Sequence, residues 1–235
     1  MSTKWPITVA VIVAVLGSSG FGPEKVNPLV VHQSTISYSK EQEYLFDVFN
    51  TRRSVRRFKP SPVPREHILK ILDMAHLAPT AGNQQPWKFL VVQDRSKLNQ
   101  LQTSCASYLL QKYQGRKPLA DDEAAKIKDE LTKNLAGYLT APVLIVVLTD
   151  SNSKYPAYNI KDGSLAAGYM MLAARALGYG SVFCTDTFPF SVVKEVFNIP
   201  VQYDVICCVP IGIPEAWPPM PPKKSLDEVT VFEKF

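Results

Sequence analysis

Two runs of apolar residues, 143–148 and 205–211, place the strongest constraint on the fold of this 235-residue chain. Within both runs consecutive side chains are apolar, so a strand built from either would carry apolar groups on both faces. Such a strand is stable only where helices cover it on each side. The two runs therefore predict a layered domain, with strands in the middle and helices outside.

Helical periodicity supplies the covering layers and alternates with further strand-like runs. The expected helices are residues 42–50, 65–78, 98–111, 121–139, 163–177 and 191–197. Residues 89–93 and 180–184 are expected as two more strands. Pro142 stands before a strand and Gly178 after a helix, where each residue commonly marks a boundary. The pattern predicts an α+β or α/β layered domain.

The composition sets the size of the domain and the kind of partner. With 46% hydrophobic residues, the chain is long enough for one well-buried domain and a short extension. Its net charge of +5 comes from basic residues spread along the whole sequence, without an aromatic and basic ladder. We therefore expect an anionic small ligand and no nucleic acid partner.

The cysteines and glycines exclude several familiar sites. No Cys-x-x-Cys pair and no nearby histidine pair occurs, so neither a zinc site nor a disulfide framework is indicated. The four cysteines, expected to pack in a reduced interior, are Cys105, Cys184, Cys207 and Cys208. Gly178 and Gly180 follow a helix and precede a strand, the reverse of a dinucleotide-binding turn.

The N-terminus differs in composition from the rest of the chain. Residues 5–21 carry no charge, and the apolar run 7–16 lies between Lys4 and a Gly/Ser-rich stretch. This layout is typical of a signal peptide or a short anchor, and it is shorter than the roughly 20 residues of a comfortable membrane span. A buried N-terminal helix is the alternative.

The chain accordingly divides into three expected parts. Residues 1–22 form the hydrophobic segment, 23–40 an irregular linker, and 41–235 the folded domain. The first part suggests a membrane-anchored or exported protein with membrane attachment through the N-terminus, and the protein is otherwise expected in the cytoplasm.

A dense basic segment follows the first expected helix of the domain. Arg52, Arg53 and Arg56 place three guanidinium groups within five residues, together with the hydroxyl of Ser54. This density is costly unless an anion or a polar heterocycle accepts hydrogen bonds from them. A solvated basic surface is the alternative reading.

A polar loop comes one helix later, in the sequence Ala-Pro-Thr-Ala-Gly-Asn-Gln-Gln-Pro-Trp of residues 78–87. Pro79, Thr80, Gly82 and Asn83 break the preceding helix and expose backbone donors before the next strand. With the basic segment, this loop indicates a site for an organic phosphate that carries a planar ring.

Three segments carry a resemblance to a known family: residues 52–56, the loop 78–87, and the C-terminal Lys-Lys-Ser-Leu-Asp-Glu of 223–228. Together they resemble the FMN-dependent nitroreductase superfamily, over a match from about residue 41 to the C-terminus. Residues 183–185 are similar to its iodotyrosine deiodinase branch. The resemblance implies a three-layer α/β/α fold of the α+β class, with a mixed, mostly antiparallel sheet, in an intertwined homodimer.

The resemblance also implies FMN as the cofactor and assigns residues to it. Arg52 and Arg53 would hold the phosphate and ribityl end, Ser54 the ribityl chain, and Arg56 the pyrimidine edge of the ring. Lys223 would complete the set of cations around the phosphate. The family commonly has arginine at this position, so lysine would weaken FMN retention. The full expected FMN-binding set is Arg52, Arg53, Ser54, Arg56, Thr80, Ala81, Gly82, Asn83, Phe183, Cys184, Thr185, Lys223, and Lys224 as a close alternative to Lys223.

Two of these residues are expected to act in catalysis. A cation at Arg56 would favour negative charge on the reduced ring and so make the flavin easier to reduce. The Thr185 hydroxyl would lie near the flavin N5 and support one-electron steps, unless residues 184–185 are only a strand end. No metal and no dedicated acid or base is expected, because hydride can pass directly between stacked rings.

The dimer and the substrate complete the expectation. Residues 80–83 would cover the flavin of the opposite subunit, and a strand at 229–232 would reach the partner's sheet. Substrate specificity would lie in 104–138, where Tyr108, Tyr113, Lys112 and Arg116 could form a mobile lid. The Glu, Tyr and Lys set with which deiodinases grip an amino acid zwitterion cannot be placed in full.

The expected function is that of an FMN-dependent oxidoreductase. It would move hydride from NADH or NADPH to a nitroaromatic, a quinone or a related aromatic acceptor by a ping-pong mechanism. The alternatives are reductive dehalogenation of halogenated phenols or tyrosines, and flavin binding without turnover.

Overall fold

The computed structural model describes residues 37–235, within two compact units made of residues 1–46 and 47–235. The expectations for residues 1–22 and for most of the linker lie outside the described residues. In the first unit, the Ser39 N–H donates to Gln42 Oε1 and the Gln42 N–H donates to Ser39 Oγ, at 2.9 and 3.3 Å. This reciprocal pair starts helix α1 (Lys40–Thr51). Between residues 37 and 235, no helix is long and apolar enough to cross a membrane.

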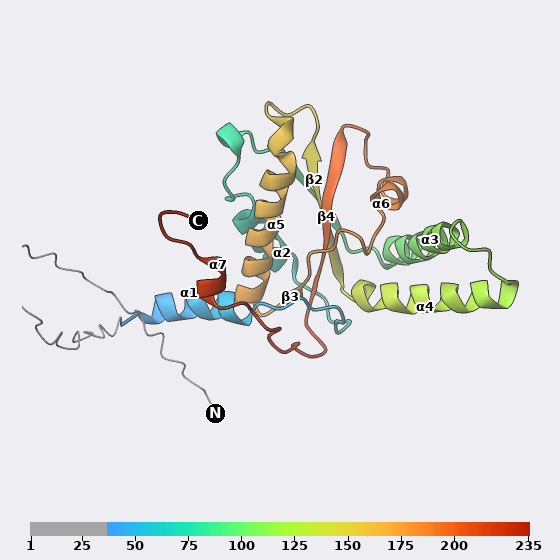
Figure 1. Ribbon diagram of the computed structural model, residues 1–235, viewed down its shortest axis with the longest axis horizontal. Helices are drawn as coiled ribbons and strands as arrows, with labels where there is room; N and C mark the ends of the chain where they lie inside the picture. The colour runs from blue at the N-terminus through green and yellow to red at the C-terminus, as the bar shows by residue number, and fades with distance from the viewer. Residues whose placement is uncertain (1–36) are drawn as a thin grey trace, which may run out of the picture. The chain divides into compact units, whose positions relative to one another are not determined.

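A four-stranded sheet forms the middle of the second unit (Figure 1). Its order is β1 (Trp87–Val92), β2 (Val143–Asp150), β4 (Tyr203–Gly212) and β3 (Gly180–Ser181), and all three neighbouring pairs are antiparallel. Outside these strands, Ser54 forms an isolated parallel β-bridge with Ser181 of β3. The expected mixed, mostly antiparallel sheet is therefore confirmed.

Helices cover both faces of this sheet. In Figure 1, α2 and α5 lie on one side, and α3, α4 and α6 on the other. Besides α1, the helices are α2 (Arg65–Ala75), α3 (Arg95–Gln114), α4 (Asp121–Leu139), α5 (Asn159–Ala176), α6 (Phe190–Val196) and α7 (Leu226–Val229), with short 3₁₀ turns η1 (Ala81–Asn83) and η2 (Pro156–Tyr158).

The core confirms the three-layer arrangement that the apolar runs predicted. Successive side chains of β2 point to opposite faces of the sheet. Leu144, Val146 and Leu148 pack with α3, α4 and α6. The intervening residues, which pack with α2 and α5, are Val143, Ile145 and Val147. All six side chains are buried, so β2 contributes to both hydrophobic cores.

A β-bulge in β4 distributes its side chains unevenly. Val147 pairs with Cys207, but Leu148 pairs with Val205, which leaves Ile206 as an extra residue. Consequently Ile206 and Cys207, although adjacent, both belong to the core on the α2 and α5 side.

Several expected boundaries shift by two or three residues, and three expected elements differ more clearly from the structure. The strand expected at 180–184 has only two residues in the sheet, Gly180 and Ser181. The backbone of Cys184 pairs separately with that of Cys208, as an isolated antiparallel β-bridge. Helix α5 begins at Asn159, four residues before the expected start, because the buried residues of its first turn, Asn159 and Asp162, are polar and do not appear in an apolar periodicity. In the single chain, residues 229–232, expected to form a strand on the partner's sheet, form no strand, and Val229 is the last residue of α7. Instead, Ser225 and Glu228 form a capping box that starts α7.

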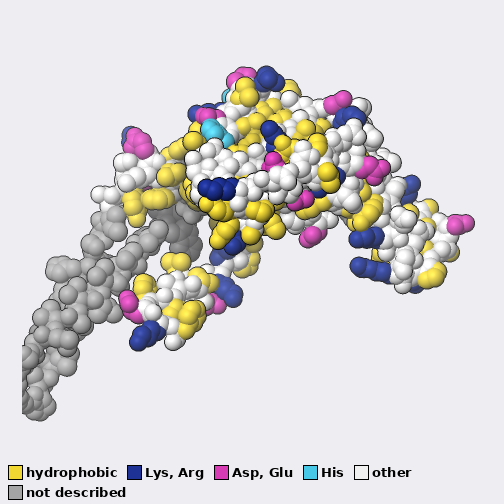
Figure 2. Space-filling view, turned by 90° about the horizontal axis from the view of Figure 1, so that it is seen from above, with side chains coloured by type: hydrophobic (Ala, Val, Ile, Leu, Met, Phe, Trp, Pro, Cys, Tyr) yellow, Lys and Arg dark blue, Asp and Glu magenta, His cyan; other side chains and the backbone are white. Residues whose placement is uncertain are grey.

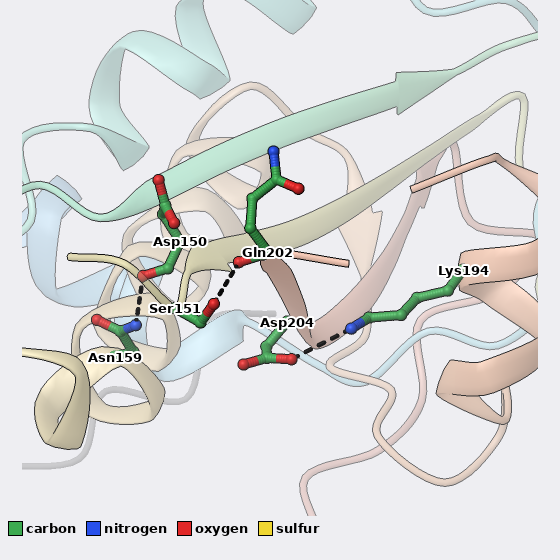
Figure 3. A network of polar contacts seen from close by, with 6 residues as sticks. All are labelled: Asp150, Ser151, Asn159, Lys194, Gln202 and Asp204. Atoms are coloured by element: carbon green, nitrogen blue, oxygen red, sulfur yellow. Dashed lines mark hydrogen bonds and ion pairs between the residues drawn. The ribbon is translucent and has the colours of Figure 1, made fainter. Parts of the chain in front are cut away.

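Polar contacts fix the start of α5 against the sheet (Figure 3). The Asn159 side chain donates to the Asp150 carbonyl at the end of β2, at 2.8 Å. Ser151, the residue after Asp150, donates its side-chain hydrogen bond to the Gln202 carbonyl at 2.9 Å. The first bond holds the start of α5, whose opposite end supports the candidate site, and the second ties the loop after β2 to the residue before β4.

Candidate functional site

Residues 52–56 are held beside the sheet by backbone contacts. The Val55 N–H donates to the Ser181 carbonyl at 3.0 Å, and the Val55 side chain is buried. A Cβ at Gly180 would lie only 2.6 Å from Val55 Cγ2, so glycine permits this close approach. With Val55 turned inward, the neighbouring Ser54 and Arg56 are available on the outer side.

The basic segment and the C-terminal segment meet around one pocket of about 450 Å³. We call it the basic pocket. One wall comes from the end of α1 and the residues that follow, the other from residues 218–223. Its lining residues are Phe49, Arg52, Arg53, Ser54, Arg56, Pro218, Pro219, Met220, Pro221 and Lys223. The structure thus brings Lys223 to four of the residues expected to bind FMN, whereas Lys224 is exposed and does not line this pocket.

Among residues 37–235, the side chains that line the basic pocket include four cations and no carboxylate. Arg53 donates to the carbonyls of Asn50 and Arg52, both at 2.7 Å, and Arg56 donates to the Ser54 carbonyl at 3.1 Å. Among residues 37–235, no acidic side chain forms an ion pair with these four cations. The remaining donors and the positive field suit an anionic ligand with several acceptor oxygens.

Arg56 also lies near the segment 183–185. Burial raises the pKa of the Cys184 thiol to about 11, while a hydrogen bond from Thr187 and the positive charge of Arg56 act in the opposite direction. Two backbone hydrogen bonds, at 3.0 and 2.9 Å, tie Cys184 to Cys208. Phe183 is half-buried against the α2 and α5 core, and Thr185 is exposed. None of residues 183–185 lines the basic pocket.

A second pocket of about 450 Å³ adjoins the first, because Arg56 lines both. Its other walls are α3, α4 and the polar residues Asp186 and Thr187. A third pocket of about 420 Å³ continues between α3 and α4 and shares Leu109, Leu131 and Asn134 with the second. The charged or phenolic residues of this third pocket are Lys112, Tyr113, Arg116 and Glu130. We call these two pockets the interhelix groove.

The loop 80–83 lies elsewhere in the single chain. The buried Asp162 carboxylate accepts from the Ala81 N–H at 3.2 Å and from the Gln84 amide at 2.7 Å, which ties the loop to α5. Gly82 and Asn83 have φ values of 54° and 55°, in the left-handed region. None of residues 80–83 lines the basic pocket or the interhelix groove.

Sequence reasoning missed the residues that support the basic pocket. Arg175 at the end of α5 contacts Thr51, which lies in the first wall directly before Arg52, and Trp217, which directly precedes the second wall. In the sequence, the position of Arg175 in the last turn of a helix suggests only a favourable interaction with the helix dipole. Among residues 37–235, no group of three or more histidine, cysteine or acidic side chains is arranged to hold a metal ion.

The sequence is similar to a known protein family and to individual known proteins. The sequence profile described as the nitroreductase family matches residues 50–213. A candidate NADH dehydrogenase/NAD(P)H nitroreductase of Methanothermobacter thermautotrophicus is 31% identical, over 72% of this chain and 77% of that protein. The iodotyrosine deiodinase of Thermotoga neapolitana is 29% identical, over 77% of this chain and 95% of its own length.

Solved structures give the same result for the fold. A crystal structure of oxidised iodotyrosine deiodinase, bound to FMN and 3-iodo-L-tyrosine, superposes with a TM-score of 0.66. It is 28% identical in sequence and covers 81% of this chain and 100% of that one.

Proposed function

Because this chain belongs to the nitroreductase family, we propose that it is an FMN-dependent oxidoreductase that reduces small aromatic acceptors with NADH or NADPH. The observation that carries this proposal is the basic pocket, where Arg52, Arg53 and Arg56 meet Lys223 and no carboxylate of residues 37–235 pairs with them. Its volume of about 450 Å³ lies within the range of small-molecule and cofactor sites.

The residues of the basic pocket fit FMN. Arg52, Arg53 and Lys223 would hold the phosphate, with Arg53 already oriented by two backbone carbonyls. Ser54 would hold the ribityl chain. Arg56, at the boundary with the interhelix groove, would hold the pyrimidine edge of the ring. When bound, FMN would supply the hydride transfer that no side chain of this site can perform.

The protein side of the mechanism is orientation and charge. Arg56 would place a positive charge where negative charge develops during reduction, which lowers the free energy of the reduced state. Thr185 is exposed, and we propose that its hydroxyl donates to the bound ring. We further propose that protons come from solvent and that the two half-reactions alternate at one site in a ping-pong mechanism.

The site would be completed in an intertwined homodimer. Large apolar side chains stay exposed on α5 and near the C-terminus, among them Ile160, Leu165, Tyr169, Leu226 and Phe232. Figure 2 shows hydrophobic side chains at the surface between charged ones. An interface formed over these residues would remove their apolar surface from water. In such a dimer, residues 80–83 would cover the flavin of the partner subunit.

Reductive dehalogenation is the second candidate. The deiodinase relatives favour it, and so does one observation: the interhelix groove holds Lys112, Arg116 and Glu130 in a single pocket. Charges of both signs close together could bind an amino acid zwitterion such as that of a halotyrosine.

One set of measurements tests these functions together. Purified protein should show the visible spectrum of a bound flavin, or bind added FMN. Anaerobic NADH or NADPH should then bleach it, and a nitroaromatic or quinone should restore the colour. Halide release from 3-iodotyrosine would favour dehalogenation, whereas a bound flavin that neither nucleotide reduces would indicate a flavin-binding protein without turnover. Folded protein that binds no FMN at micromolar concentration would contradict the proposal.

A further inference from the structure

Arg175 joins the two walls of the basic pocket without lining it. It lies in the last turn of α5, where its Nε donates a 2.9 Å hydrogen bond to Thr51 Oγ1. Its guanidinium carbon lies 4.6 Å from the centre of the Trp217 ring. Thr51 is the last residue of α1, directly before Arg52, and Trp217 directly precedes the pocket-lining residues 218–221.

We propose that Arg175 is a positioning residue that sets the distance between Arg52 and Lys223, and thereby makes the pocket selective for a phosphate-bearing flavin. This role rests on the proposed function. Arg175 would act through Thr51 and Trp217, and not by contact with the cofactor.

The chemistry of arginine suits this position. A guanidinium group can donate hydrogen bonds from its edge while its face stacks on an aromatic ring. Thr51 Oγ1 itself donates to the Asp47 carbonyl at 2.5 Å, so its lone pairs face a donor such as Arg175. A lysine would keep the charge but could not fill both contacts in the same way.

The segment between Trp217 and Lys223 explains how a contact at one end can control the other. Four of its five residues are prolines, at 218, 219, 221 and 222. Proline fixes φ and favours an extended, semi-rigid chain. Since the segment lies outside the helices and strands, the Trp217 contact with Arg175 is well placed to determine where Lys223 lies.

Flavin affinities provide the test. Apo-protein would be titrated with FMN and with riboflavin, which lacks the phosphate, and binding followed by flavin fluorescence. Arg175→Ala and Trp217→Ala should each weaken FMN binding by about three- to tenfold, while riboflavin affinity stays unchanged. Arg175→Lys should resemble Arg175→Ala, because the contacts and not the charge alone are required. Arg65→Ala, an exposed arginine outside the pocket lining, is the matched control.

A double-mutant cycle checks the route of the effect. If Arg175 acts through Lys223, Arg175→Ala should add nothing in a Lys223→Ala background. If Arg175→Ala fails to fold, Trp217→Ala and Thr51→Val each remove one contact at lower risk, since Trp217 is 42% exposed.

Three results would overturn the role: unchanged FMN affinity in Trp217→Ala and Arg175→Ala, a parallel loss of riboflavin binding, or wild-type behaviour of Arg175→Lys. Wild-type protein that binds no FMN would reject the proposed function itself, and this role with it.

Discussion

Arg56 is the residue on which the two parts of the candidate site depend. It lines both the basic pocket and the interhelix groove, and its charge reaches the Cys184 thiol. An exposed arginine in that position can serve a cofactor on one side and an acceptor on the other.

Replacing Arg56 with alanine should make the flavin harder to reduce. Loss of a partly shielded positive charge should lower the two-electron potential by about 30–60 mV, since about 1.4 kcal/mol corresponds to about 30 mV. Equilibration with redox dyes would measure the potential, with Lys59→Ala, an exposed cation nearby in sequence, as the control. An unchanged potential with FMN still bound would contradict the role of Arg56.

At the scale of elements, β3 determines where the basic segment lies. It has only two residues, yet Ser181 accepts the Val55 N–H and Gly180 leaves space for the Val55 side chain. The segment thus depends on a close packing that a single added methyl group would disturb.

Gly180→Ala should destabilise the protein and loosen the basic pocket. The new Cβ would lie 2.6 Å from Val55 Cγ2 and 2.8 Å from Pro214 Cγ, and such overpacking typically costs about 1–3 kcal/mol. Urea unfolding would measure the free energy of unfolding, and an FMN titration the affinity. Gly115→Ala, where the nearest atoms are 3.6 Å away, should change stability by less than about 0.5 kcal/mol. Equal stability of the two variants would show that the contact with Val55 is unimportant.

The elements that the sequence predicts well are those whose pattern is local. Strands β2 and β4 follow from uninterrupted apolar runs, and residues 121–139 form α4 with the expected bounds. Strand β3 is shorter than its apolar run, because strand length depends on the partner that pairs with it. For the site, the arginine cluster and Lys223 could be identified from short motifs. The contact between Arg175 and Trp217 could not, because it forms only when the end of α5 meets a distant proline-rich segment.

At the scale of the whole molecule, the exposed apolar face of α5 should control assembly. Leu165→Glu combined with Tyr169→Glu should convert a dimer to a monomer, because both side chains are exposed and charges there would oppose burial. Analytical ultracentrifugation would measure the mass, and the visible spectrum the FMN content, which should fall together. Val201→Glu changes a side chain that is 90% exposed at a different turn and should leave both unchanged. A double variant that remains dimeric would exclude this face as the interface.

Buried thiols should make the protein less stable at high pH. Burial raises the pKa of Cys105 to about 12 and of Cys184 to about 11, and those of Cys207 and Cys208 further, from an ordinary value of 9.0. Because the folded-state pKa is the higher one, the stabilisation is complete below pH 9 and is lost as pH rises towards 11–12. Between pH 9 and its folded-state pKa, each thiol should lower the free energy of unfolding by about 1.4 kcal/mol for every unit that the pH rises.

Urea unfolding at pH 8, 9 and 10, under reducing conditions, would measure this slope. Other groups also titrate there, so the comparison with Cys105→Ala is decisive, since this variant should lose the contribution of one thiol. An identical slope in both proteins would contradict the assignment.

The two walls of the basic pocket come from opposite ends of the folded domain, so they are synthesised at different times. A nascent chain that has already made its arginine cluster still lacks the lysine that faces it. Coenzyme capture should therefore follow synthesis of the C-terminal segment, and proteolytic loss of that segment from a finished molecule should release the bound coenzyme while leaving the sheet and its covering helices folded.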